Sequence, residues 1–178
     1  MIELRPFGRA DFDRLIEWAT SRELVVQWAG LGFTYPLDHA QLDAYLTVAE
    51  EDPEPRVIWK AVDAGTGVVV GHIELDRIHR AMRRARLSRV LVAPGLRGEG
   101  VGKAMTLLAL RHAFAVLDLH RVDLGAFDFN TAAIRCYESC GFVREGLERD
   151  GVRVGDVYWS AVQMSILEGE WRALHDAK

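Results

Sequence analysis

The sequence feature with the clearest chemistry is a glycine-rich segment that precedes a predicted helix. Its residues are, in order, Arg97, Gly98, Glu99, Gly100, Val101, Gly102 and Lys103. Glycine allows positive φ angles and lets a ligand approach the backbone closely. The first N–H groups of a helix lack internal partners and, together with the helix dipole, favour an anion such as phosphate. The segment therefore predicts a phosphate-binding turn, with a purely structural strand-to-helix turn as the alternative.

Two common phosphate-binding motifs do not match this segment. A P-loop requires glycine at the position of Arg97 and serine or threonine at that of Ala104. The dinucleotide-binding pattern G-x-G-x-x-G requires a third glycine where Lys103 or Met105 stands, depending on the glycine from which it starts. Neither motif is therefore present.

A second informative cluster follows a predicted strand over residues 121–126. Asn130 can cap a helix, and Ala133, Ile134 and Tyr137 share one face at helical spacing. Gly141 can end the helix in left-handed geometry. On their own, these features predict a well-capped helix over residues 131–140.

The remaining elements indicate an α/β (α+β) protein with a mixed sheet and helices on its faces. Further helices are predicted over residues 11–19, 38–50 and 100–117, and residues 24–28 either extend the first of these or form a short helix of their own. Strands are predicted over residues 2–6, 57–63, 68–78, 85–92, 142–148 and 153–167, with turns at 64–67 and 149–151. The strands before the glycine-rich segment form an antiparallel meander.

The two clusters, in this order and β/α context, resemble the GCN5-related N-acetyltransferase (GNAT) superfamily over essentially the whole chain. The pattern [QR]-x-x-G-x-[GA] is matched at Arg97, Gly100 and Gly102. The later pattern N-x-x-A-x-x-x-Y-x-x-x-G-F is matched at Asn130, Ala133, Tyr137, Gly141 and Phe142. Residues 4–6, 144–146 and 170–171 look most like the RimJ/RimL branch. The resemblance implies the GNAT fold, with six to seven mostly antiparallel strands and about four helices.

The resemblance also implies that acetyl-CoA lies where the strands over residues 85–92 and 121–126 splay apart. Backbone groups of Val90, Leu91 and Val92 would then pair with the pantetheine arm, although the same side chains are equally typical of core packing. The amides of residues 97–103 would hold the pyrophosphate. Asn130 and Tyr137 would lie near the cofactor.

In this family an amine attacks the thioester directly. A backbone N–H at the end of the strand, at Val92, would polarise the carbonyl. Tyr137 would donate a proton to the departing thiolate, since a phenol with a pKa near ~10 suits an acid at neutral pH. The alternative role of Tyr137 is to pack its helix on the sheet.

The residue that accepts the proton of the amine is less clear, because the strand before the glycine-rich segment carries no carboxylate. Glu74 on the neighbouring strand is the first candidate. Alternation places it on one face with His72 and Asp76, and that face is either solvated or lines the substrate cleft. Asp128 is a second candidate, and an ordered water is a third possibility.

Three further features bear on the candidate site. The aromatic segment over residues 28–35 is expected to shape the acceptor site, with a hydrophobic plug over the sheet as the alternative. Cys136 and Cys140 are interpreted as small packed residues. The six histidines form no H-E-x-x-H motif, so no metal is predicted.

Length and composition limit the number of domains and the classes of function that the chain can have. The 178 residues, with 49% hydrophobic residues, are expected to form a single domain, 1–178, in which the acidic segment 50–56 is a surface loop. A net charge of -4 argues against general nucleic-acid binding. Two cysteines exclude a disulfide framework, and no apolar run has the length of a signal peptide or membrane span. A cytoplasmic location is therefore expected.

These observations predict an acetyl-CoA-dependent N-acetyltransferase. Its acceptor would be a small-molecule amine or a protein N-terminus, and a homodimer is possible. The alternative is an acyl-CoA-binding sensor that has kept the cofactor loop but lost turnover.

Overall fold

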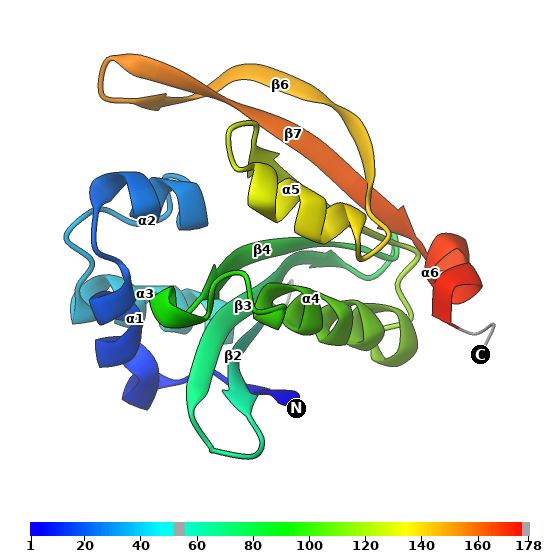
Figure 1. Cartoon of the computed structure of the whole chain (residues 1–178), viewed down its shortest axis with the longest axis horizontal. Helices are drawn as coiled ribbons and strands as arrows, with labels where there is room; N and C mark the ends of the chain where they lie inside the picture. Colours follow the sequence, from blue (N-terminus) through cyan, green and yellow to red (C-terminus); the bar gives the residue numbers. More distant parts are fainter. Residues whose placement is uncertain (52–55, 176–178) are drawn as a thin grey trace.

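The computed structural model describes residues 1–51 and 56–175 of the chain. Seven strands form one mixed sheet in the order β1-β2-β3-β4-β5-β7-β6 (Figure 1). The strands are β1 (Ile2–Pro6), β2 (Val57–Asp63), β3 (Val69–His79), β4 (Arg84–Val92), β5 (Arg121–Phe127), β6 (Val143–Val154) and β7 (Val157–Leu167). Only β4 and β5 pair in parallel. The mixed, mostly antiparallel sheet expected from the sequence is thereby confirmed.

Six α-helices flank the sheet in the described part of the chain. They are α1 (Phe12–Trp18), α2 (Arg22–Ala29), α3 (His39–Glu51), α4 (Val101–Arg111), α5 (Thr131–Glu138) and α6 (Glu168–His175). This is more than the four or so expected, for two reasons. Ser21 caps α2 as a helix of its own, since its hydroxyl accepts a hydrogen bond from the Leu24 N–H, and α6 follows β7 where no helix was predicted.

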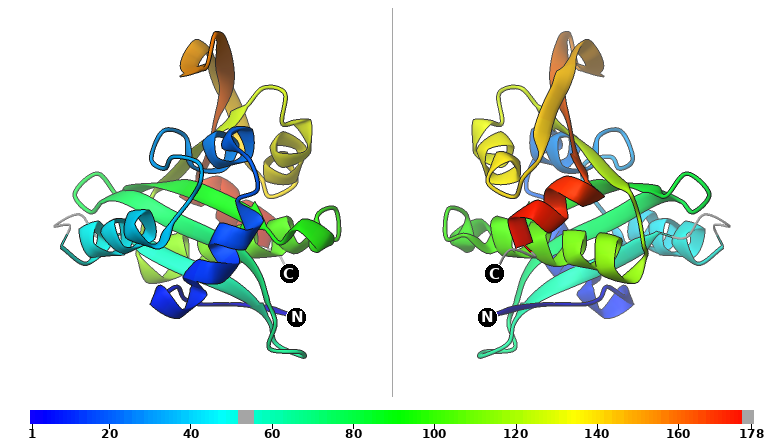
Figure 2. Two further views of the ribbon diagram at one scale, coloured as in Figure 1. Left: turned by 90° about the vertical axis from the view of Figure 1, so that its left-hand side faces the viewer. Right: turned by 90° about the vertical axis from the view of Figure 1, so that its right-hand side faces the viewer.

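The helices divide between the two faces of the sheet, as Figure 2 shows for α3 and α4. One hydrophobic cluster joins residues of α1, α2 and α3 to Ile58 and Leu91 of the sheet. A larger cluster joins α4, α5 and α6 to the opposite face of β2, β3, β4, β5 and β7. Because both faces are covered, β3 is buried along most of its length rather than on alternate residues.

The last hairpin differs from the expectation. The turn predicted at residues 149–151 lies within β6, where the register shifts between Glu148 and Val152. The chain reverses instead just before β7, at Gly155, whose φ of 62° is a left-handed angle that suits glycine. The helix predicted over residues 100–117 is helical over almost that whole span, but it changes type, because α4 passes into a π-helical turn, His112–Val116.

The parallel pairing of β4 with β5 is short, and the separation of the two strands beyond it leaves room for a ligand. The two strands pair at only three positions, which are Arg84 with Arg121, Ala85 with Val122 and Arg86 with Asp123. β4 continues to Val92 and β5 to Phe127, so the strands diverge after Arg86. α5 begins a short turn after the diverging end of β5, and α4 begins at Val101 after a 3-10 turn, Pro94–Leu96, and the glycine-rich segment.

Part of the predicted surface loop, residues 52–55, lies outside the described residues. Within residues 1–51 and 56–175, no helix is long and apolar enough to cross a membrane.

Candidate active site

A cavity of about 480 Å³ lies where β4 has separated from β5, and it is lined by the end of β4, the glycine-rich segment, α2 and α5. Of the residues predicted to bind a cofactor, its walls contain Val90, Leu91, Val92, Arg97, Gly98, Gly100, Gly102, Lys103, Asn130 and Tyr137. The fold therefore brings together two sequence clusters that lie about thirty residues apart along the chain. Two predicted residues are not in the wall. Glu99 is exposed, and Val101 is buried in the core cluster beneath α4.

The glycine-rich segment has the geometry of an anion-binding turn. Gly98 and Gly100 adopt φ angles of 88° and 81°, in the left-handed region that disfavours other residues. Gly100 is the N-cap of α4 and has no side chain with which to accept a hydrogen bond from the first turn. The first N–H groups of α4 thus remain available to a ligand, and the helix dipole favours a negative one.

The charges around the cavity fit a polyphosphate. Arg97, Lys103 and Arg135 belong to its wall and are exposed. Among the described residues, no aspartate or glutamate lines it. The region near the start of α4 is therefore positive although the whole chain carries a net charge of -4.

Tyr137 projects from α5 and is partly exposed to the cavity. Its ring packs edge-on against Phe142 at a centroid distance of 5.9 Å. Its hydroxyl has no hydrogen-bond partner within residues 1–51 and 56–175, so the proton is free for a ligand. Burial raises the pKa of Tyr137, with further contributions from Cys136 and Cys140, which keeps the hydroxyl protonated at neutral pH.

Asn130 caps α5 as predicted, because its Oδ1 accepts a hydrogen bond of 3.2 Å from the Ala133 N–H. Gly141 follows the helix with a φ of 99°, which is the left-handed ending expected there. These two residues fix the position of α5 and, with it, that of Tyr137.

Glu74 lies outside the cavity wall and is fully buried beneath the N-terminal helices. Its carboxylate accepts hydrogen bonds from the Tyr45 hydroxyl and the Arg89 guanidinium. Burial raises the pKa of Glu74, opposed by the charge of Arg89. The expectation of a solvated face or a cleft wall is therefore wrong for this part of β3, since α3 and its neighbours cover it. The role of Glu74 as proton acceptor stays a prediction.

His72 shares this buried face and has no access to the cavity. Its ring lies edge-on to Phe7 and Trp28, at centroid distances of 4.9 and 5.5 Å, and its Nδ1 donates to the Arg89 carbonyl. Burial lowers the pKa of His72 to about 4, so the ring is neutral. The other residue considered as a proton acceptor, Asp128, is exposed after β5 and does not belong to the cavity wall.

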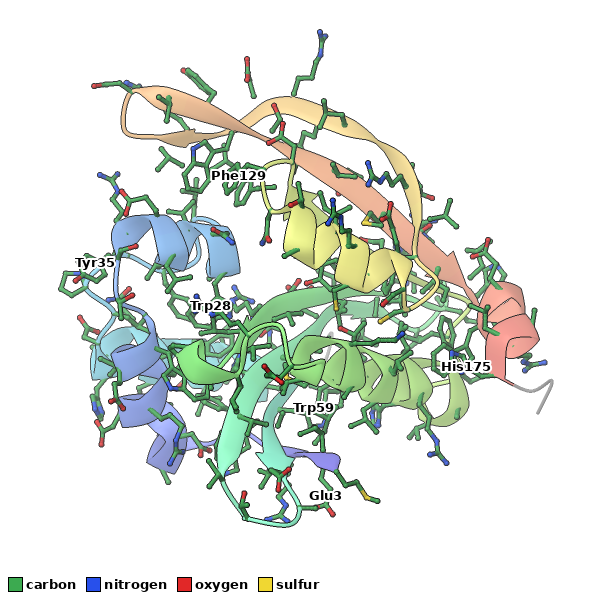
Figure 3. The ribbon with its side chains drawn as sticks, viewed as in Figure 1. Glu3, Trp28, Tyr35, Trp59, Phe129 and His175 are labelled. Carbon is green, nitrogen blue, oxygen red and sulfur yellow. The ribbon has the colours of Figure 1, made fainter. Side chains whose placement is uncertain are left out.

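The aromatic segment over residues 28–35 forms a hydrophobic plug and contributes one residue to the cavity wall, while its role in shaping the acceptor site stays a prediction. Trp28 and Phe33 are buried and stack at 5.4 Å, which is the hydrophobic plug. Trp28 also belongs to the cavity wall, and Figure 3 shows it directed from α2 toward the sheet, whereas Tyr35 lies at the outer edge of the molecule. The indole Nε1 of Trp28 is buried and has no hydrogen-bond partner among the described residues.

Sequence reasoning missed several wall residues. Leu24 and Gln27 of α2 join Trp28 in the wall, and their i, i+3, i+4 spacing was the signal that could have identified this face. Cys136 was interpreted as a packed residue, but it is only half-buried and lines the cavity, whereas Cys140 is buried as expected. A hydrogen bond with the Cys140 thiol, and secondarily the charge of Lys103, lower the pKa of Cys136 to about 7 against the effect of burial.

No group of three or more histidine, cysteine, aspartate or glutamate side chains that could hold a metal ion occurs in the described part of the chain. What the arrangement offers is a positive turn for a phosphate, an apolar channel along β4, and a protonated phenol beside that channel.

Comparison with known proteins agrees with this arrangement. Residues 2–143 match the model of a family described as acetyltransferase (GNAT) domain. A spermidine N(1)-acetyltransferase of Vibrio cholerae is 30% identical over 172 residues, which cover 96% of this chain and 95% of that protein. A putative ribosomal N-acetyltransferase of Bacillus subtilis, YdaF, is 30% identical over 105 residues, covering 59% of this chain and 57% of that protein.

Among solved structures, the spermidine N-acetyltransferase of Vibrio cholerae in complex with CoA and spermine superimposes with a TM-score of 0.83 at 25% identity. The match covers 96% of this chain and 97% of that one. Because polyamine and ribosomal acetyltransferases both occur among these relatives, the RimJ/RimL branch expected from the sequence is not specifically supported.

Proposed function

The chain belongs to the acetyltransferase (GNAT) family, and we propose that the cavity between the end of β4 and α5 is where it binds acetyl-CoA and transfers the acetyl group. Its activity is that of an acetyl-CoA-dependent N-acetyltransferase acting on an amine. The main support for this assignment is that the cavity is continuous from the pyrophosphate-binding turn to the proposed acid. One space joins the left-handed glycine turn at the start of α4 to the unpartnered hydroxyl of Tyr137.

The cofactor would lie along this space. The first N–H groups of α4, with Arg97 and Lys103, would hold the pyrophosphate. The pantetheine arm would run beside Val90, Leu91 and Val92, where β4 has lost its parallel partner and its backbone groups can pair with a ligand.

The transfer step then uses groups at the inner end of the cavity. The nitrogen of the neutral amine attacks the thioester carbon, the C–N bond forms and the C–S bond breaks. Tyr137 donates its proton to the departing sulfur, and the nitrogen of the new amide gives up one proton that restores the Tyr137 hydroxyl through solvent. A backbone N–H at the end of β4 polarises the carbonyl oxygen. No protein side chain is acylated in this scheme.

For the acceptor, we propose a small-molecule primary amine. Support comes from the relative of nearly equal length whose name gives spermidine as its substrate. A polyamine is therefore the first class to test, and a protein N-terminus is the second. The absence of carboxylates from the described wall means that the charges binding a polycation would have to come from outside the cavity.

We also propose that residues 1–178 act as one N-acetyltransferase domain, because β6 and β7 complete the same sheet beyond the end of the family match. The homodimer and the cytoplasmic location stay predictions.

The test combines binding and turnover. We expect acetyl-CoA to raise the melting temperature, and we expect free thiol to appear when spermidine, simple alkyl amines and short peptides are offered in turn. Lack of stabilisation by acetyl-CoA would overturn the assignment of the cavity. Stabilisation without thiol release from any amine would favour the alternative of an acyl-CoA sensor.

A further inference from the structure

The two cysteines of the chain lie on either side of Tyr137, at the end of α5. Cys136 is half-buried and belongs to the cavity wall, whereas Cys140 has an exposed fraction of 1% and does not belong to it. A hydrogen bond links the two thiols. A reagent that enters the cavity therefore meets one sulfur, and the second sulfur lies next to the first, shielded from solvent.

Both sulfurs also lie against the first turn of α4, which runs beside α5 (Figure 1). A Cβ atom placed on Gly102 would be 3.8 Å from the Cys136 Sγ, an ordinary van der Waals distance. The Cys140 Sγ is 3.9 Å from the Lys103 carbonyl oxygen, to which it donates a weak hydrogen bond. The pair therefore borders the glycine-rich segment at which the pyrophosphate is proposed to bind.

The charges around Cys136 favour its thiolate, which is the reactive form of a cysteine. Arg97, Lys103 and Arg135 share the cavity wall with it, and no carboxylate of the described residues does. The hydrogen bond with the Cys140 thiol lowers the pKa of Cys136 to about 7, and the same contact, together with burial, raises the pKa of Cys140. At neutral pH the cavity thus presents one reactive sulfur, with a protonated thiol beside it.

We propose that Cys136 and Cys140 form a reversible oxidation site, in which a hydroperoxide oxidises Cys136 and Cys140 converts the product to a disulfide. The Cys136 thiolate attacks one oxygen of the peroxide, so that an S–O bond forms, the O–O bond breaks and the leaving oxygen takes up a proton. The Cys140 sulfur then attacks the sulfenic acid, the S–S bond forms, and the S–O oxygen leaves as water with the Cys140 proton. The two thiols lose two electrons and two protons, and hydrogen peroxide becomes two waters.

Oxidation changes the cavity because the disulfide encloses Tyr137 in the chain between its two cysteines. An S–S bond is shorter than any contact between two thiols, so the end of α5 shifts and Cys140 moves away from the Lys103 carbonyl. The proposed acid moves with that segment, and turnover falls. This loss of turnover rests on the proposed function, whereas oxidation of the two thiols does not. Bound acetyl-CoA fills the cavity and shields Cys136, so the peroxide acts on the empty enzyme.

The test exposes the reduced, full-length protein to hydrogen peroxide and, after the peroxide is removed, measures its intact mass and its turnover with an amine that the parent acetylates. We expect the mass to fall by that of two hydrogen atoms, peptide mapping to find Cys136 linked to Cys140, and kcat to fall by about tenfold or more. Dithiothreitol should restore both the mass and kcat. Acetyl-CoA at about ten times its Kd should slow the oxidation about tenfold, because only the empty fraction reacts.

Two variants, each compared with itself before and after peroxide, separate the roles of the cysteines. Cys136→Ser should form no disulfide and keep its own turnover through the treatment. Cys140→Ala leaves Cys136 without a resolving thiol, so Cys136 should gain oxygen atoms and pass to sulfinic acid, which dithiothreitol does not reverse. It should react more slowly than the parent, since the contact that lowers the pKa of Cys136 is gone. Full recovery of Cys140→Ala with dithiothreitol would show that Cys140 has no resolving role.

Two outcomes in the parent would overturn the assignment. One is a pair of cysteines that stays reduced while the methionines of the same protein are oxidised, and the other is a disulfide that leaves kcat unchanged. A parent that shows no turnover before the treatment contradicts the proposed function instead. The change of mass then still decides whether the two cysteines form the oxidation site.

Discussion

The guanidinium carbon of Arg89 lies 5.0 Å from the centre of the Tyr45 ring, and both side chains bind the same buried carboxylate, that of Glu74. A cation over an aromatic face is stabilised by about 0.5–2 kcal/mol, more when water is excluded. Arg89 itself adopts a φ of 47°, at the point where the register between β3 and β4 shifts. The cluster therefore ties α3 to the bulge that directs the end of β4 toward the cavity.

Glu74→Gln should lower stability without changing how activity depends on pH. The amide cannot accept from both Tyr45 and Arg89 as a carboxylate does, and an unpaired buried guanidinium costs about 1–3 kcal/mol. Burial raises the pKa of Glu74 in the folded state above its ordinary value of 4.5. Its carboxyl therefore stabilises the fold fully below that ordinary value, and the contribution is lost as pH rises through the raised one.

Urea unfolding at a series of pH values from 4 upward checks this prediction. The parent should lose part of its free energy of unfolding as the pH rises above the ordinary glutamate value, and Glu74→Gln should lack that component. If instead Glu74→Gln changes how kcat/KM depends on pH, Glu74 is the proton acceptor as first predicted.

How far the sequence could predict these features differs from residue to residue. The functional roles of Gly100 and Tyr137 came from the resemblance to the GNAT superfamily, whereas the glycine turn before a helix and the capped helix that carry them were predicted from spacing, because both are local structures. The environment of Glu74 was not predicted, since alternation assigns residues to the two faces of a strand but does not show which face a distant helix covers. The hydrogen bond of 3.1 Å that the Ser88 hydroxyl of β4 donates to Asp76 of β3 depends on the register across a bulge, which is a long-range property. Cys136 and Cys140 differ in exposure for the same reason.

Gly100→Val should strongly weaken the binding of acetyl-CoA. A β-branched residue at a φ of 81° is strained, and its side chain would project at the start of α4, where the pyrophosphate is proposed to lie. Calorimetric titration should show affinity weaker by about 100-fold, which corresponds to about 2.7 kcal/mol. Gly95→Val is the matched control, because Gly95 is exposed in the same loop, has open space around it and does not line the cavity. Retained affinity in Gly100→Val would contradict the proposed pyrophosphate site.

Alkylation of Cys136 should inactivate the enzyme, and acetyl-CoA should protect it. The thiol lines the cavity, and its pKa is lowered to about 7, so the reactive thiolate forms at neutral pH. The rate of labelling by iodoacetamide, followed by mass spectrometry, should therefore rise with pH around a midpoint near that value. Cys140→Ala should move the midpoint upward, because it removes the thiol whose hydrogen bond is the main cause of the lowered pKa. Labelling that acetyl-CoA does not slow would place Cys136 away from the cofactor.

Tyr137→Phe should lower turnover strongly while leaving the fold and the binding of acetyl-CoA unchanged. The ring keeps its edge-on packing against Phe142, and the lost hydroxyl has no partner in the described part of the chain, so neither a contact nor a buried hydrogen bond disappears. Loss of an acid that acts only in the transition state lowers kcat and kcat/KM together, here by about 10²–10⁴-fold.

The pH profile provides an independent check on Tyr137. Burial raises the pKa of its hydroxyl above the ordinary value of 10.0, so the parent should show no loss of activity from this group as the pH rises toward 10. Stopped-flow measurement of thiol release in the parent and in Tyr137→Phe gives both quantities. Full turnover in Tyr137→Phe would leave the ring with only its packing role, and the proton for the departing thiolate would then have to come from solvent.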